Sequence, residues 1–243
     1  MAVTLRETMF LNGILTNCEI WYGLTKGDIS QLEDIDKLLL RKIFNVASSC
    51  PIEALYLELG VIPINMVIKS RRLNYLHYLA TRVESGMLHK FFITQWKYPE
   101  KRNDWTEQAK LDLAEFEIPE DLDFIKKKSK LSFKQLVRSQ VREISLEKLL
   151  NAKQKHSKMI NLFYVELEIQ EYLKEKSINT SQAKAVFKFR TRMANFSENF
   201  KGQAGTQPCP LCRLHLDIKF LFQKLVIDFF FRILDIFEIA MYQ

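Results

Sequence analysis

The chain has few residues that turn or interrupt the backbone, with only 7 glycines and 6 prolines among 243 residues. Because these two residues mark most turns, their scarcity disfavours a fold of many short strands. The polar–apolar alternation of half-buried strands is also absent, and no internal repeat is visible. Hydrophobic residues make up 47% of the chain, enough for a packed core. We therefore predict an all-α fold: an irregular multi-helix bundle with a short Cys-x2-Cys loop and a C-terminal apolar amphipathic helix.

Motifs of the common catalytic sites are missing as well. The chain has no Asp-Asp pair, by which a polymerase palm holds two metal ions. It also lacks the patterns His-Glu-x-x-His, Gly-x-x-x-x-Gly-Lys and Gly-x-Ser-x-Gly. The acidic cluster at 117–123 lies in a polar stretch and is typical of solubilising charge. We therefore expect a protein without enzymatic activity.

Apolar periodicity and cap residues predict where the helices lie. Asp28 or Ser30 can cap one helix, and Pro51 suits the first turn of the next, which Gly60 ends. Asp104, with a Glu three residues later, fits a capping box. The predicted helices span residues 5–24, 28–46, 51–60, 63–84, 87–96, 105–117, 120–127, 131–153, 159–175 and 181–196.

The net charge is +7, and the positive charge is concentrated in one segment. Residues 126–158 hold eleven Lys and Arg against two Glu, whereas residues 104–123 hold eight acidic residues against one Lys. Such a boundary indicates a polarised surface whose basic part faces a polyanion. The alternative is that these charges only solvate the outer faces of helices.

Helical spacing arranges some of these cations in lines. Cations four residues apart share a helix face and can follow a phosphate backbone, and each phosphate that they neutralise releases counterions. We predict one such line in each of two helices, 131–153 and 181–196, with apolar residues opposite; a solvated outer face of the bundle is the alternative. The candidate residues are Lys134, Arg138 and Arg142 in the first helix, and Lys184, Lys188, Arg190 and Arg192 in the second.

A third line mixes cations with aromatic rings and consists of Arg71, Tyr75, Tyr78 and Arg82. Aromatic rings stack on unpaired bases, and guanidinium groups stack or pair with phosphate, which suits single-stranded nucleic acid. The alternative is that both tyrosines lie between core and solvent because they are amphipathic.

Only two of the four cysteines are spaced as metal ligands. Cys209 and Cys212 form a Cys-x2-Cys pair, and His215 is a candidate third ligand. No Cys or His follows His215, so the four ligands of a structural zinc site are incomplete. Cys18 and Cys50 lie in apolar-periodic stretches, which predicts buried free thiols. Free thiols and the charged start of the chain, which does not fit a signal peptide, indicate an intracellular protein, nuclear or cytoplasmic.

Eight short segments are informative through their order and spacing: NGILTN at 12–17, EIW at 19–21, DKLLLRK at 36–42, PIEALYLELG at 51–60, RRLNYLH at 71–77, FFITQW at 91–96, FKFRTRMAN at 187–195 and CPLC at 209–212. Over about residues 5–223 the chain resembles the reverse-transcriptase protein of non-LTR (LINE-type) retrotransposons. In that family these segments follow the polymerase palm, in a helical thumb-and-linker stretch that leads to a Cys/His knuckle. The family knuckle closes with a further Cys after a Phe-Gln pair, whereas Lys224 follows that pair here.

The resemblance implies a division into four regions: a helical thumb-like region at 1–97, a basic helical linker region at 104–196, a partial Cys/His knuckle at 197–215 and a divergent apolar tail at 216–243. In the family, this part of the protein helps to grip template RNA and target DNA during target-primed reverse transcription. Because the palm carboxylates are missing, we expect a non-catalytic, retrotransposon-derived fragment that binds RNA or single-stranded DNA. We expect no cofactor other than weakly held zinc.

The tail at 216–243 supports a second hypothesis. Five charged residues from Lys224 to Glu238 form a narrow polar stripe on an otherwise apolar helix, and they are too many for a transmembrane span. Such a helix docks on the body of the protein, on a partner or at a membrane interface. The alternative function is therefore a helical protein-interaction module that self-associates through 216–243. Self-association that disappears on deletion of 216–243 would favour it.

The incomplete ligand set predicts a defective zinc site. Cys209, Cys212 and His215 leave at least one coordination position to water or to a group from elsewhere, and such sites release zinc to mild chelation. We expect substoichiometric zinc in the purified protein, and little change in helix content or melting temperature on addition of a chelator. Elemental analysis before and after dialysis checks this, and one zinc per chain retained through dialysis against a chelator would contradict it.

Overall fold

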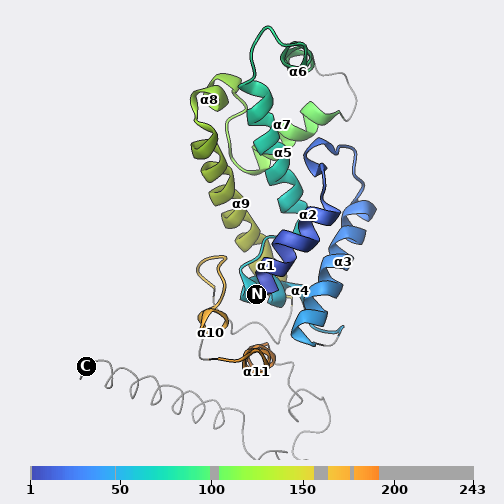
Figure 1. The fold of residues 1–243 in the computed structure, drawn as a ribbon, viewed down its shortest axis with the longest axis vertical. Helices are drawn as coiled ribbons and strands as arrows, with labels where there is room; N and C mark the ends of the chain where they lie inside the picture. Colours follow the sequence, from blue (N-terminus) through green and yellow to red (C-terminus); the bar gives the residue numbers. More distant parts are fainter. Residues whose placement is uncertain (1, 47, 99–103, 156–163, 176–177, 192–243) are drawn as a thin grey trace, which may run out of the picture. The chain divides into compact units, whose positions relative to one another are not determined.

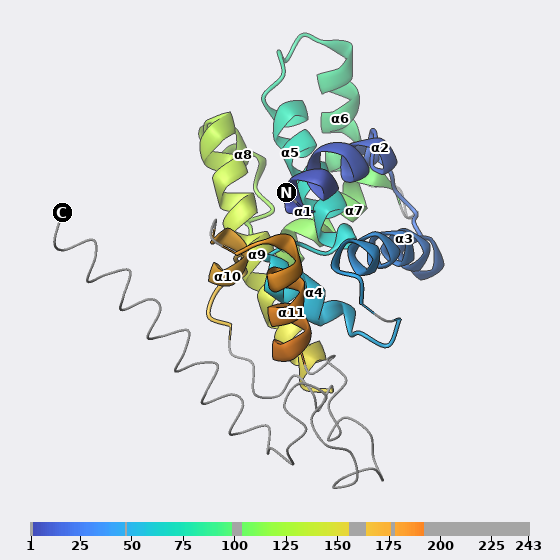
Figure 2. The same ribbon diagram turned by 60° about the horizontal axis from the view of Figure 1, so that its bottom comes forward.

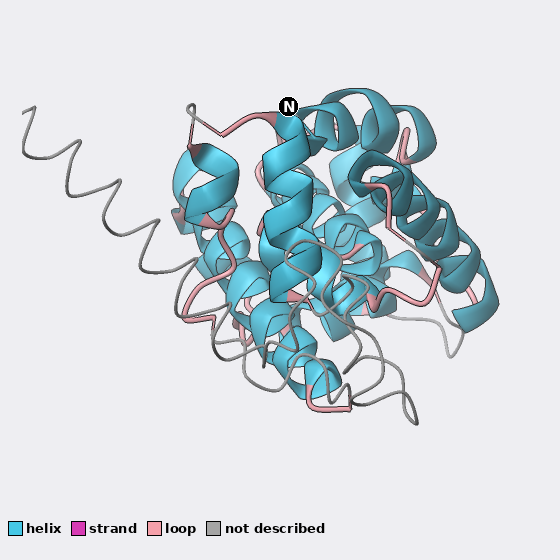
Figure 3. Ribbon diagram, turned by 90° about the horizontal axis from the view of Figure 1, so that it is seen from below, coloured by secondary structure: helices cyan, strands magenta, loops and turns pink. Residues whose placement is uncertain are grey.

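The computed structural model describes residues 2–46, 48–98, 104–155, 164–175 and 178–191 (Figure 1). Within these residues the chain is all-α, as predicted. Figure 3 shows helices and connecting loops, and the described residues contain no strand, only an isolated antiparallel bridge between Leu59 and Ile169. None of the described helices is long and apolar enough to cross a membrane. The predicted Cys-x2-Cys loop and C-terminal helix lie outside the described residues.

Capping side chains set where the longest helices begin. Thr25 and Asp28 form a reciprocal capping box at the start of α3, and the Ser129 hydroxyl accepts a hydrogen bond from the Ser132 N–H at the start of α9. These side chains satisfy backbone N–H groups that have no partner in the first helical turn. The helical elements are α1 (Ala2–Leu5), the π-helical turn η1 (Arg6–Phe10), α2 (Leu11–Ile14), the 3-10 turn η2 (Cys18–Ile20), α3 (Lys26–Phe44), α4 (Ile52–Leu59), α5 (Ile64–Ala80), α6 (Met87–Lys97), α7 (Trp105–Glu115), α8 (Leu122–Lys127), α9 (Lys130–Lys153), α10 (Glu171–Lys174) and α11 (Thr180–Arg190).

Two predicted helices are wrong over much of their length. The first, predicted for 5–24, ends at Ile14, because Asn17 takes a left-handed conformation with φ 56° and the Leu15 carbonyl accepts a hydrogen bond from Arg71 instead. The helix predicted for 159–175 is helical only in α10 among its described residues. There the Gln170 N–H donates to the Glu58 carbonyl at 3.0 Å, so a tertiary hydrogen bond replaces a helical one.

Helix α5 lies at the centre of the described body (Figures 1 and 2). It contacts α3, α6, α7, α8, α9 and the turn η2, and its buried residues include Leu73, Leu76 and Leu79. Apolar side chains from α7 and α9, including Leu113 and Val137, complete the core around it. Helices from both predicted helical regions, 1–97 and 104–196, therefore share one core.

Two buried ion pairs tie sequence-distant helices together. The Arg6 guanidinium donates to both carboxylate oxygens of Asp36 at 2.7 Å, and the Tyr56 hydroxyl donates to the same carboxylate at 3.0 Å. Arg72 on α5 donates to Asp112 on α7 at 2.5 Å, and burial raises the pKa of this aspartate although Arg72 acts against the shift. A buried charge needs such partners, because removal of one leaves the other without solvation.

A third buried charge, Glu58 on α4, holds the end of the described chain, which we call the strap (residues 164–175 and 178–191). The carboxylate of Glu58 is fully buried and accepts hydrogen bonds from the hydroxyls of Tyr164 at 2.6 Å and Tyr172 at 2.8 Å. It also accepts from Arg190 Nε at 3.0 and 3.1 Å. Burial and the Glu58 charge raise the pKa of both tyrosines, so they remain protonated donors. We call these four residues the Glu58 cluster.

Gly60 allows the strap to lie directly against the end of α4. Its φ is +60°, and a Cβ built at this position would lie 2.2 Å from the carbonyl carbon of Glu168 and 2.4 Å from the nitrogen of Ile169. Glycine is therefore required here twice, for the left-handed conformation and for the close approach of a second backbone. Sequence patterning predicted the first requirement, the helix end, but not the second.

Substitution of Gly60 by alanine should loosen the strap. A side chain in the left-handed region costs about 1–2 kcal/mol, and the collision with the backbone at 168–169 adds to this. We expect Gly60→Ala to lower the melting temperature by at least a few degrees and to increase proteolytic cleavage within 164–191.

The matched control is Gly13→Ala in α2, where a Cβ would meet no atom within 4 Å. Because alanine favours helix, this variant should be neutral or stabilised by up to about 1 kcal/mol. Equal melting temperatures of the Gly60→Ala variant and the wild type would show that the strap does not rest on Gly60.

Candidate nucleic-acid interface

An open hollow of about 560 Å³ runs along α5 and the first turns of α9. Its lining includes Arg71, Tyr75 and Tyr78 from α5, and Lys130 and Lys134 from α9. The structure thus brings most of the predicted aromatic line together with the start of the predicted basic line. These two lines are more than fifty residues apart in the sequence, and only the packing of α9 against α5 joins them.

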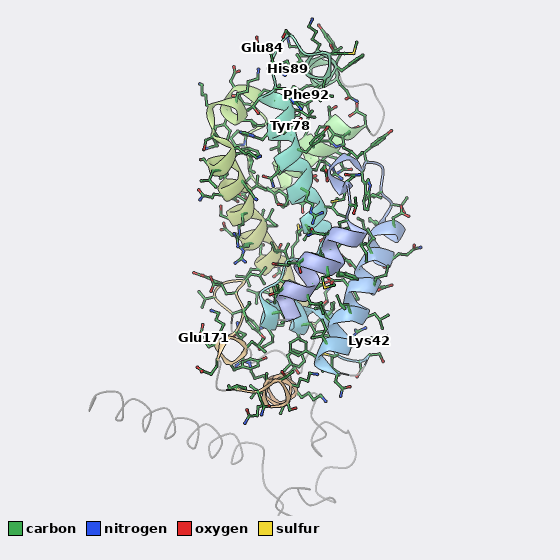
Figure 4. The ribbon with its side chains drawn as sticks, viewed as in Figure 1. Lys42, Tyr78, Glu84, His89, Phe92 and Glu171 are labelled. Carbon is green, nitrogen blue, oxygen red and sulfur yellow. The ribbon has the colours of Figure 1, made fainter. Side chains whose placement is uncertain are left out.

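The aromatic rings on α5 form a continuous row (Figure 4 labels Tyr78). The Trp105 ring meets the Tyr75 ring edge-on with centroids 5.8 Å apart, and Tyr75 and Tyr78 stack at 5.7 Å with 21° between their planes. The Arg82 guanidinium lies 4.4 Å from the centroid of the Tyr78 ring. Tyr78 is 40% exposed, so the outer end of this row faces solvent. We call these four residues the ring row.

Hydrogen bonds to the first turns of the chain fix the inner end of the ring row. The Trp105 indole N–H donates to the Glu19 carbonyl at 2.8 Å. Arg71 donates to the Leu15 carbonyl at 2.8 Å and to Asn12 Oδ1 at 3.0 Å. Arg71, a predicted nucleic-acid contact, is therefore engaged within the protein and shapes the wall of the hollow.

The exposed basic line of α9 begins one turn earlier than predicted, at Lys130, and ends before Arg142. Lys130, Lys134 and Arg138 are exposed at steps of four residues, and within the described part of the chain they make no ion pair. Lys130 was missed, although its spacing from Lys134 could have revealed it. Arg142 is half-buried and donates to the Leu167 carbonyl of the strap at 3.1 Å, so it belongs to the packing of the strap on α9.

The predicted basic line of α11 is divided between surface and core. Lys184 and Lys188 are half-buried, Arg190 turns inward to the Glu58 cluster, and Arg192 lies outside the described residues. The lining of the hollow includes no residue of α11. The structure therefore does not join the two predicted basic lines at this hollow.

Part of the acidic stretch at 104–123 neutralises lysines instead of forming a separate surface. The Glu115 carboxylate lies between Lys69 and Lys148, with the Lys148 contact at 2.5 Å. Lys110 is paired with Glu120 at 3.0 Å. These lysines are thus engaged in ion pairs, whereas Lys130, Lys134 and Arg138 on α9 make none within the described residues.

A larger hollow of about 970 Å³ lies beside α6 and α8, but its charges cancel. Its lining mixes Glu84, Asp121 and Asp123 with Lys90 and Lys126, and Lys126 approaches Glu84 at 3.9 Å. The hollow along α5 and α9 has one acidic lining residue, Glu19, against three cations. Because carboxylates repel phosphate, the hollow beside α6 and α8 suits a polyanion less well.

The predicted zinc ligands Cys209, Cys212 and His215 lie outside the described residues, and the described residues contain no group of three His, Cys, Asp or Glu that could hold a metal ion. Cys18 and Cys50 are buried free thiols, as predicted. Burial raises the pKa of the Cys50 thiol to about 11, although nearby Arg41 acts against the shift, and burial also raises the pKa of Cys18.

No protein-family model matches this chain, and searches of curated proteins and of solved structures find no match to it.

The buried thiols should react slowly. At pH 8 a thiol with a pKa of about 11 is almost entirely protonated, whereas an ordinary Cys with a pKa of about 8.5 is partly ionised. We expect Cys50 to be alkylated at least about a hundredfold more slowly in the native protein than in the denatured protein, which quantitative peptide mass spectrometry can measure. Equal rates in the two states would contradict the burial of Cys50.

Proposed function

We propose that this chain binds RNA or single-stranded DNA through the hollow along α5 and α9, without catalysing a reaction. One observation carries the proposal: Lys130 and Lys134, exposed and without an ion pair within the described residues, line the same hollow as the stacked tyrosines of the ring row. Cations without carboxylate partners remain available for phosphate, whereas paired cations would first have to give up an ion pair. Stacked rings beside them offer the second kind of contact that single strands use.

The resemblance to the post-palm region of LINE-type reverse transcriptases supports the same function. One of the segments that carry it, RRLNYLH at 71–77, belongs to α5 and supplies one wall of the hollow. In that context we propose a retrotransposon-derived protein that grips a nucleic acid inside the cell, in the nucleus or the cytoplasm. The missing palm carboxylates leave binding as its activity.

A second candidate function, a protein-interaction module, has its own observation. Large apolar side chains are exposed where α5 turns into α6, with Met87 75% and Phe91 67% exposed and Val83 and Leu88 beside them in sequence. Exposed apolar groups of this kind often mark protein contacts. The tail at 216–243, on which the hypothesis from the sequence rests, lies outside the described residues.

Removal of the unpaired cations should weaken binding and reduce its dependence on salt. We expect the double variant Lys134→Gln/Arg138→Gln to lower the slope of log affinity against log salt by about one unit for each phosphate that the protein no longer neutralises. Fluorescence anisotropy with a labelled single-stranded oligonucleotide, measured over a series of salt concentrations, gives this slope.

The control is Lys26→Gln/Lys42→Gln on α3, which removes the same charge from two exposed residues outside the hollow (Figure 4 labels Lys42). It should leave the slope nearly unchanged. If both double variants change the slope equally, only net charge drives binding, and the line on α9 has no special role. Strong protein self-association without any nucleic-acid affinity would favour the second candidate function.

A further inference from the structure

The geometry points to a site for one unpaired nucleobase at Tyr78, between the Tyr78 ring and the Arg82 guanidinium. This inference rests on the proposed function and adds what the hollow recognises: the flat face of a base that is free of its neighbours. The ring row already has the arrangement that such a site needs, a stack of flat groups that ends in a cation.

The tyrosine side of the site is held rigidly. Tyr75 supports the inner face of Tyr78, and Trp105 supports Tyr75 from the edge while its indole N–H is fixed on the Glu19 carbonyl. A base that stacks on Tyr78 therefore meets a preorganised surface, and little side-chain freedom remains to be given up on binding.

The arginine side of the site can move. Arg82 follows the last residues of α5 and is exposed, and within the described residues its guanidinium makes no ion pair and rests on the Tyr78 ring. It can swing away, admit a base and close again on the outer face of that base, because guanidinium planes stack on bases as they stack on tyrosine. The Arg82–Tyr78 contact thus marks the space that the base takes.

The lysines on the other wall of the hollow fit the phosphates that flank such a base. Lys130 and Lys134 line the same hollow as Tyr78, so a strand anchored at Tyr78 can run between the two helices. In a duplex both faces of a base are covered by its neighbours, and no base can enter the ring row without unstacking. The site therefore favours single strands over duplexes of the same charge.

Tyr78→Ala tests the site against Tyr78→Phe in the full chain. Alanine removes the stacking surface, whereas phenylalanine keeps it and removes only a hydroxyl that makes no hydrogen bond within the described residues. We expect Tyr78→Ala to weaken binding of labelled oligodeoxythymidine about tenfold, and Tyr78→Phe to bind within about twofold of wild type. An abasic strand of the same length, which keeps the phosphates, should bind wild type and both variants alike.

The outcomes separate this site from charge-driven binding. Circular dichroism first establishes that both variants keep the wild-type helix content and melting temperature; if Tyr78→Ala does not, Arg82→Ala, which removes only the exposed side, replaces it. If wild type binds the abasic strand as tightly as oligodeoxythymidine, or if Tyr78→Ala weakens both strands equally, the base site is overturned while charge-driven binding stands. If wild type binds neither strand, the proposed function fails together with the base site.

Discussion

The carboxylate of Glu58 is the group on which the end of the described chain depends. It has no contact with solvent, and a buried carboxylate without partners would cost several kcal/mol. Its side-chain partners among the described residues come from the strap: Tyr164, Tyr172 and Arg190. The strap therefore has one favourable position on α4, in which every donor reaches the carboxylate, and the backbone contacts at Gly60 set how closely it lies. The position of α11 depends on this buried charge and on Phe187, which packs against Phe44 in the core.

Hydrogen bonds within the protein also determine which cations are available at the candidate interface. Three arginines that resemble surface cations in the sequence are used to hold the protein together: Arg71 on the Leu15 carbonyl, Arg142 on the Leu167 carbonyl and Arg190 on Glu58. Lys130 and Lys134, at the start of α9, are exposed and make no ion pair within the described residues. Arginine's planar, multiply donating group suits buried partners, whereas lysine keeps its charge in water. The chemistry of the two side chains thus explains why these arginines bind within the protein while the lysines stay at the surface.

The role of a residue could be predicted from the sequence when the residues that it contacts are close to it along the chain. The end of α4 at Gly60 and the start of α9 rest on neighbouring residues, and local spacing predicted both within a few residues. The roles of Arg71 and Arg190 could not be predicted in this way, because their partners lie 56 and 132 residues away. Glu58 did leave a signal, a single charge within the apolar run LYLELG, and such an isolated acid indicates a buried partner. The hollow itself required knowledge of how α9 packs on α5.

The long separation between Glu58 and Arg190 also sets an order of events during folding. The contacts of α5 with α6, α7 and α8 close shorter loops than the Glu58 cluster, in which Glu58 and Arg190 are 132 residues apart. The entropic cost of closing a loop rises slowly with its length, and this longest closure is met more easily once the intervening helices are already packed. On the ribosome, moreover, the strap is synthesised after every helix that it covers. We therefore expect α4 to present an uncovered carboxylate until late in folding, when docking of the strap removes it from water.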